Sequence, residues 1–179
     1  MKIRLLASLV TLLLTVILFS IMFTYAFSES SYVYVDQEKG SDLNNGSIDS
    51  PFATINKAIE HYNRQEINTN SNFAGKIILC SDYVLLNPSD FNETQHRNTH
   101  IEISSIDSSV LYIAPNTNYY LGGPTTFKNI NISVKGKVNF VANFNSITFD
   151  TGVKVLFENA SSKINVFGGY KEYLNEVLQ

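Results

Sequence analysis

Very short apolar segments separated by turn residues make up the chain after residue 75, and they limit the folds open to it. The segments are rich in β-branched and aromatic residues, as strands are, and Asn, Asp, Gly, Ser and Pro separate them. They lie at residues 77–79, 83–86, 101–103, 110–113, 119–121, 127–134, 138–142, 147–149, 153–157 and 164–167. The intervals are too short for the crossover of a βαβ unit, which takes about a dozen residues. The pattern therefore predicts an all-β fold: a sandwich, a barrel or a solenoid.

Two features favour the solenoid. The segments are often apolar at adjacent positions, as in the stretch TTFKNINISV that begins at Thr125. A degenerate repeat also recurs at steps of roughly 20 residues, with Phe127-Lys-Asn-Ile, Ser146-Ile-Thr-Phe and Ile164-Asn-Val-Phe as its members. A period near 20 residues is typical of one coil of a parallel β-helix, in which each coil buries its inward residues against its neighbours. Because the repeat is degenerate, it leaves a sandwich open.

A strand, a loop and a helix are predicted before these segments. Residues 32–35, YVYV, alternate as a strand does, and a loop crowded with Asp, Asn, Gly and Ser follows. After Pro51, which suits the first turn of a helix, apolar residues recur at helical spacing. They are Phe52, Ile55, Ala58, Ile59 and Tyr62. The spacing predicts a helix over residues 52–64.

The segment from Val35 to Ile59 resembles the start of right-handed parallel β-helix domains of the pectate-lyase-like superfamily. In that family a strand ending in Val-Asp precedes Gly-Ser-Asp, then Asn-Gly-Ser or Asn-Gly-Thr, then Pro-Phe-x-Thr-Ile-x-x-Ala-Ile. The matching residues here are Val35-Asp36, Gly40-Ser41-Asp42, Asn45-Gly46-Ser47 and Pro51-Phe52-Ala53-Thr54-Ile55-Asn56-Lys57-Ala58-Ile59. The resemblance implies a short right-handed parallel β-helix over residues 31–170.

Later stretches extend the resemblance. Residues 120–130, 142–145 and 167–170 are similar to repeats in exported bacterial β-helix proteins of no settled activity. The family's helix covers the apolar end of the first coil, and its Gly-rich loop turns the strand into the helix. The resemblance therefore implies that residues 52–64 form a capping helix and that the loop before it is mainly a hinge, in which Gly40 and Gly46 adopt conformations that other residues avoid. It names an architecture more than a reaction.

The first 28 residues predict export. Lys2 and Arg4 precede an uncharged run from Leu5 to Ala26, which is the order of a secretory signal. Small residues at Ala26 and Ser28 suit cleavage after residue 28, but the run is also long enough to span a bilayer. We expect residues 1–28 to be a cleaved signal peptide or a membrane anchor. The protein would then be extracellular, either secreted or attached to the membrane by this segment alone.

Charge and cysteine content argue against a nucleic-acid partner and against an intramolecular disulfide. The chain has 13 Lys and Arg against 16 Asp and Glu; without Lys2 and Arg4, 11 basic side chains remain against 16 acidic ones. No basic stripe of the kind that binds nucleic acid is visible, so a nucleic-acid partner is not expected. The single cysteine, Cys80, cannot form an intramolecular disulfide, and its apolar neighbours predict a buried and unreactive thiol.

One stretch of the loop offers candidate metal ligands. Asp42, Asn44, Asn45 and Asp49 are oxygen ligands within eight residues, and oxygen is the ligand that calcium prefers. The spacing does not follow the EF-hand pattern, because Gly46 falls where a ligand is needed and no Glu follows at the right distance. A looser calcium site remains as an alternative to the hinge, and no other cofactor is expected.

The resemblance also raises the question of catalysis. Lyases of this fold use calcium held by a carboxylate cluster to acidify a proton beside a carboxyl group, and an Arg or Lys removes that proton. No acidic cluster recurs at coil spacing beside a Lys or Arg, and the acidic residues after residue 75 are scattered: Asp82, Asp90, Glu93, Glu102, Asp107, Asp150 and Glu158. We therefore name no catalytic residue.

The expected function is a non-catalytic module that binds polysaccharide or serves in adhesion at the cell surface. The alternative is a small polysaccharide lyase or glycoside hydrolase of the same fold. Tyrosines can stack on sugar rings or pack in the interior, and the sequence alone does not separate the two roles; the candidates are Tyr83, Tyr112, Tyr119, Tyr120 and Tyr170. Residues 171–179 are expected to cap the last coil or to lead into further coils of a longer array.

Overall fold

The computed structural model describes residues 32–69, 74–86, 100–142 and 145–168, together with Thr15 and Phe91. The chain divides into two compact units, Met1–Ser31 and Tyr32–Gln179. Apart from Thr15, the first unit lies outside the described residues, and so do the predicted signal or anchor segment and the predicted tail at residues 171–179. The described part of the chain contains no helix long and apolar enough to cross a membrane.

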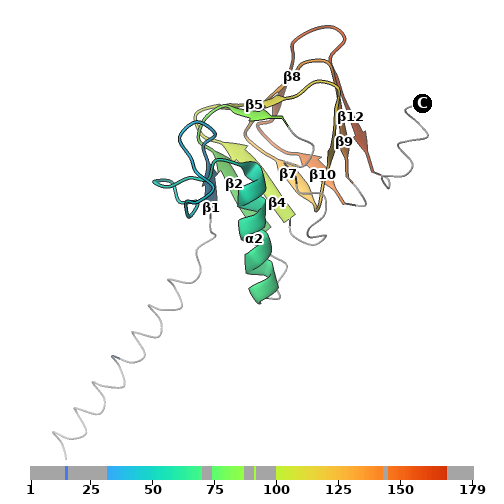
Figure 1. The fold of residues 1–179 in the computed structure, drawn as a ribbon. Helices are drawn as coiled ribbons and strands as arrows, with labels where there is room; N and C mark the ends of the chain where they lie inside the picture. Colours follow the sequence, from blue (N-terminus) through green and yellow to red (C-terminus); the bar gives the residue numbers. More distant parts are fainter. Residues whose placement is uncertain are drawn as a thin grey trace, which may run out of the picture. The chain divides into compact units, whose positions relative to one another are not determined.

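The second unit is a parallel β-solenoid of about three turns (Figure 1). Its strands are β1 (Tyr32–Val35), β2 (Ala74–Leu79), β3 (Tyr83–Leu85), β4 (His100–Ser105), β5 (Val110–Ile113), β6 (Thr117–Tyr120), β7 (Thr125–Phe127), β8 (Asn131–Val134), β9 (Lys137–Val141), β10 (Ile147–Phe149), β11 (Lys154–Phe157) and β12 (Lys163–Phe167). The first sheet has the order β1-β2-β4-β7-β10, the second β3-β5-β8-β11 and the third β6-β9-β12. All these pairings are parallel, which confirms the solenoid and excludes the sandwich. The right-handed sense of winding stays a prediction.

The coil length agrees with the repeat in the sequence, but the third predicted repeat belongs to a different sheet from the first two. Ile101 pairs with Thr125, and Thr125 pairs with Ile147, which are steps of 24 and 22 residues in the first sheet. Ile164, the start of the third predicted repeat, pairs instead with Val138 in the third sheet. Strands of one coil share the same apolar composition, so sequence similarity alone does not identify the sheet to which each belongs.

The segment predicted at residues 127–134 is two strands. β7 ends at Phe127 and β8 begins at Asn131, and the two belong to different sheets. Between them Asn129 has φ +47°, in the left-handed region. Asn tolerates this conformation better than most residues, so a single residue turns the chain through the corner of the coil. The corner is too short to contain a run of polar residues, so the sequence pattern did not separate the two strands.

Helix α2 spans Ile55–Thr69, so it begins three residues later than the predicted start and ends five later than the predicted end. Phe52 is not helical: it forms a parallel bridge with Val35 and lies in the core. Thr54 then caps the helix, because its hydroxyl accepts a hydrogen bond from the Lys57 amide at 3.1 Å. Phe52 lies at helical spacing from the apolar residues of α2, but its backbone pairs with Val35 of β1 instead.

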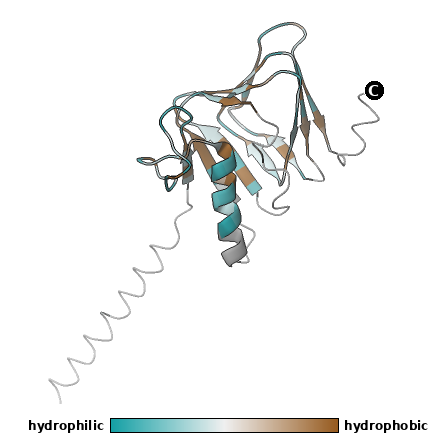
Figure 2. Ribbon diagram, viewed as in Figure 1, coloured by the Kyte–Doolittle hydropathy of each residue, from teal (hydrophilic) through white to brown (hydrophobic). Residues whose placement is uncertain are grey.

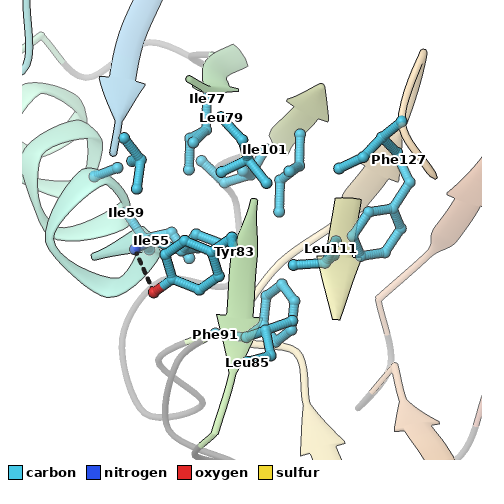
Figure 3. Packing of buried hydrophobic residues seen from close by; sticks show 14 of the residues in the cluster. Ile55, Ile59, Ile77, Leu79, Tyr83, Leu85, Phe91, Ile101, Leu111 and Phe127 are labelled. Carbon is cyan, nitrogen blue, oxygen red and sulfur yellow. Dashed lines mark hydrogen bonds between the residues drawn. The ribbon is translucent and has the colours of Figure 1, made fainter. Parts of the chain in front are cut away.

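The core fills the interior of the coils from the capped end onward. The buried face of α2, which is Ile55, Ala58, Ile59 and Tyr62, packs in one cluster with residues of the strands. Figure 3 shows this packing around Tyr83, whose hydroxyl accepts a hydrogen bond from the Ile55 amide at 3.2 Å. Polar residues occupy the visible face of α2, whereas apolar positions recur along the strands (Figure 2). Burial of each large side chain contributes about 1.5–3 kcal/mol, so the cap and the coils stabilise one another.

A ladder of asparagines runs through the third sheet. Asn118 pairs in register with Asn139, and Asn139 with Asn165, at steps of 21 and 26 residues. The Asn139 side-chain amide donates to Oδ1 of Asn118, and that of Asn165 donates to Oδ1 of Asn139 at 2.7 Å. Identical amides at equivalent positions of successive coils hold neighbouring strands in register.

Candidate functional site

The predicted calcium ligands lie in the loop between β1 and α2, and Asp42 holds the start of the helix. Its Oδ1 accepts the backbone amides of Ala53 and Thr54, both at 3.0 Å, and its Oδ2 accepts the Thr54 hydroxyl at 2.9 Å. A carboxylate that accepts amides at the start of a helix is stabilised by the helix dipole and in turn stabilises the helix. The main contacts of Asp42 are therefore those of a hinge.

The other three candidates also serve the loop itself or face solvent. The Asn44 side-chain amide donates to the Pro51 carbonyl at 2.8 Å, and Oδ1 of Asn45 accepts the Ser47 amide at 3.0 Å. Asp49 is exposed. Within the described ranges, no group of three or more His, Cys, Asp or Glu side chains is placed to hold a metal ion. The hinge has direct structural support, and calcium binding stays a prediction.

Asp36 joins this loop to the next coil. Its Oδ1 accepts the backbone amides of Glu38 and Lys39, at 3.0 and 3.1 Å, and the hydroxyl of Ser81 at 2.9 Å. Burial opposes the charge, but these hydrogen bonds outweigh it and lower the pKa of Asp36 below its usual value. The Val-Asp pair at the end of β1 therefore has a structural role, in which the carboxylate ties the loop to the turn after β2.

The structure also contains a hollow that the sequence did not reveal, at the corner between the first and second sheets. It has a volume of about 330 Å³ and is lined by Ser105, Ser108, Asn129, Ile130, Asn131, Gly152 and Lys154. Three successive coils contribute to it, because each passes this corner between a strand of the first sheet and a strand of the second. We call these seven residues the corner hollow.

Backbone conformation shapes the corner hollow. Ser108, Asn129 and Gly152 all have positive φ, at 62°, 47° and 76°. A Cβ atom at Gly152 would lie 2.2 Å from Oδ1 of Asn129, so only glycine leaves room for that amide. The three coils thus turn sharply at the same place, and their polar side chains gather there.

Hydrogen bonds within the corner hollow hold two of its polar side chains in place. The Ser105 hydroxyl donates to the Asn129 carbonyl at 3.2 Å, and the Asn131 side-chain amide donates to the Ser108 carbonyl at 2.8 Å. In the part of the chain that the structure describes, no acidic side chain pairs with Lys154, whereas neighbouring Lys128 pairs with Asp150 at 3.4 Å. The hollow therefore combines amide and hydroxyl groups with one ammonium group.

An amphipathic surface adjoins the corner hollow on the outer side of the second sheet. Asn131 and Lys154 pair in register at the start of their strands, and two residues further on Tyr112, Ser133 and Leu156 form the next outward row. Tyr112 is 37% exposed and Leu156 51% exposed, whereas Ser133 between them is only 6% exposed and its hydroxyl donates to Oε1 of Glu158 at 2.9 Å. Two residues along a strand span about 7 Å, so one ligand can contact both rows. We call Tyr112, Ser133 and Leu156 the second-sheet face.

The structure assigns most of the tyrosines left open by the sequence. Tyr83 and Tyr119 are buried, and the Tyr119 hydroxyl donates to the Leu85 carbonyl at 2.9 Å. Tyr120 is half-buried, and Tyr170 lies outside the described residues. Of these five, Tyr112 is the one whose side chain the structure places at the surface.

The fold defines the class of the protein as a parallel β-solenoid with a helix before its first complete coil. Comparison with family models, curated proteins and solved structures finds no match to the chain. The coarser part of the sequence-based resemblance, a β-helix, is confirmed, and membership of the pectate-lyase-like superfamily stays a prediction.

Proposed function

We propose that the chain is an exported, non-catalytic module that binds polysaccharide in the corner hollow and across the second-sheet face. The observation that carries this proposal is the placement of amide and hydroxyl groups from two coils, and of an ammonium group from a third, beside an exposed tyrosine. Sugars present hydroxyl groups that need donors and acceptors, and an apolar ring face that packs on an aromatic ring. The site offers both kinds of contact within two strand positions.

A repeating ligand suits this site because the site itself repeats. Equivalent positions of successive coils lie about 4.8 Å apart across a parallel sheet, and the hollow is lined by two such sets, Asn131 with Lys154 and Ser108 with Asn129 and Gly152. A long polymer can follow this direction, whereas a small compact ligand uses only one corner. Export agrees with the proposal, because extracellular polysaccharides are then accessible; it rests on the uncharged run after Lys2 and Arg4.

The alternative is a small polysaccharide lyase or glycoside hydrolase, and it rests on the superfamily resemblance. Such an enzyme needs a carboxylate pair or a metal-assisted base near the sugar. The pair closest in sequence to the corner hollow is Lys128–Asp150, and the Thr151 amide together with Lys128 lowers the pKa of Asp150. An ionised Asp150 is unsuited to act as a general acid, although it keeps the charge that a base or nucleophile needs. We favour binding because the proposal rests on polar and aromatic groups and not on a pair of carboxylates.

Binding to a polysaccharide array tests the proposal, with the full chain compared with two variants. Tyr112→Ala removes the aromatic surface and is expected to weaken binding roughly 5- to 10-fold, as the loss of about 1 kcal/mol of stacking implies. Leu43→Ala is the matched control, because Leu43 is 97% exposed in the loop before α2 and should leave binding unchanged.

A degradation assay on every polysaccharide that binds separates the two functions. The proposal expects intact polymer after prolonged incubation, with or without added calcium. Shortened products that disappear in an Asp150→Asn variant would establish the enzymatic alternative. Binding that is equal in the Tyr112→Ala variant and the wild type would show that the second-sheet face is not the site.

A further inference from the structure

The two ends of the solenoid differ, and the end at β1 is closed. Beside β1 the Tyr34 amide donates to the Gly46 carbonyl, and the Phe52 amide donates to the Tyr34 carbonyl, both at 2.9 Å. The Asp36 amide donates in turn to the Phe52 carbonyl at 2.9 Å. The loop before α2 therefore occupies the free edge of the first sheet, and α2 packs on the apolar interior.

The opposite end is open over the described residues. Each sheet ends in a strand with one neighbour, namely β10, β11 and β12. Apolar side chains that point into the solenoid also become exposed within a single coil. Phe127, Val134 and Phe140 are 0% exposed. Their partners in the last coil are Phe149 at 38%, Phe157 at 53% and Val166 at 47% exposed. Apolar interior thus continues into the surface at this end.

The open edge carries few of the side chains that normally prevent strand pairing. Natural edge strands carry charges, prolines or bulges that discourage addition of another strand. Among the residues of β10, β11 and β12 only Lys154 and Lys163 are charged, and none is proline. Both lysines stand at the first position of their strands. In antiparallel pairing each would therefore meet the far end of a partner strand rather than another lysine.

We propose that this open end binds the open end of a second copy of the chain and forms a two-fold dimer. A partner that covers this end must pair with three strand edges at once, those of β10, β11 and β12. A single peptide strand can pair with only one of them. A second solenoid end presents three strands with the same spacing. Because the β1 edge is already occupied, head-to-tail stacking has no free edge in the first sheet, and the self-complementary pairing closes after two copies.

The asparagine ladder also supports a dimer through the open end. Asn165 donates to Asn139, and its Oδ1 stands at the open end as the last acceptor of the ladder. Its amide nitrogen carries a second N–H. Two copies of Asn165 related by a two-fold axis can therefore exchange amide hydrogen bonds and extend the ladder across the dimer.

Sedimentation equilibrium of the full chain in a mild detergent tests the dimer. The wild type is expected to dimerise, and the double variant Phe157→Lys with Val166→Lys should weaken the dimer at least tenfold, since like charges would meet in an apolar contact. These side chains are about half exposed, so the substitutions should leave the circular dichroism spectrum unchanged. Leu43→Lys is the matched control and should remain dimeric.

Disulfide trapping provides the second measurement and locates the contact. In a Cys80→Ser background, Asn165→Cys should form a covalent dimer under mild oxidation much faster than Leu43→Cys, because residue 165 lies opposite its own copy in the proposed pairing. Cα atoms of opposed strands lie about 4.5–5.5 Å apart, which a disulfide can bridge. A monomeric wild type, a dimer that persists in the lysine double variant, or equal trapping at the two positions would each overturn the proposal. All variants carry residues 1–31, so association through that segment would affect them equally.

Discussion

Asn63 is buried on helix α2, and neither polar atom of its side chain has a hydrogen-bond partner. An amide that leaves water without finding a partner lowers stability by about 1–3 kcal/mol. Helical spacing places Asn63 with the polar residues Asn56, Lys57 and Glu60, on the side away from the apolar stripe. A helical wheel predicts which face meets the nearest neighbour, but it does not predict that a helix capping a solenoid is covered over more than one stripe.

We expect Asn63→Leu to stabilise the protein by about 1–3 kcal/mol, because the substitution removes an unpaired buried amide and keeps the same branched side-chain skeleton. Urea unfolding followed by circular dichroism measures the change. Asn56→Leu is the control on the same helix: Asn56 is half-buried and should not yield this gain. A loss of stability in the Asn63→Leu variant would mean that the amide has a partner in solution.

Cys80 gives a prediction about pH. Burial raises the pKa of its thiol, and the charge of Asp36 raises it further. A raised pKa means less thiolate at neutral pH, so alkylation by iodoacetamide should be slower than in the unfolded chain and should accelerate only above the usual pKa of cysteine. Asp36→Asn should shift the rate profile toward lower pH. An unchanged profile in that variant would exclude the charge of Asp36 as a cause.

At the scale of the elements, the sequence predicted which segments are strands better than it predicted how they assemble. Most strands lie within a few residues of the predicted segments because β-branched and aromatic runs mark them locally. The corner at Asn129 and the bridge at Phe52 were missed, since a left-handed residue and a single backbone bridge leave no periodic signal. The sheet of each strand depends on its neighbours in other coils, which no local pattern contains.

The hinge before α2 should control the helix. Asp42→Ala removes three hydrogen bonds at the start of α2, so we expect a loss of about 1–2 kcal/mol in stability, at the upper end of what one helix cap contributes. Thermal unfolding measures it. Asp49→Ala, an exposed position in the same loop, should change little. Equal effects of the two substitutions, or rescue of the Asp42 variant's loss by calcium, would argue against the hinge.

At the scale of the whole molecule, the candidate site became visible only in three dimensions. Ser108, Asn131 and Lys154 stand about one coil apart in the sequence, in stretches that look like ordinary turns and strand starts. The solenoid brings them together because every coil turns at the same corner. The loop near residue 42 drew attention for the opposite reason, since its polar residues are clustered in sequence yet serve mainly to hold the backbone.

The closed β1 end also sets an order of events during folding. Contacts in a solenoid join each coil only to its neighbours, so the structure can nucleate at one place and grow outward. The chain is synthesised from its N-terminus, and the cap and the first strands therefore exist before the last coil does. Each later coil can pair with the strands of the coil before it. The edge beside β1 is already paired with the loop before α2, so no further strand can add there. We therefore expect the coils to fold mainly in the order from β1 to β12.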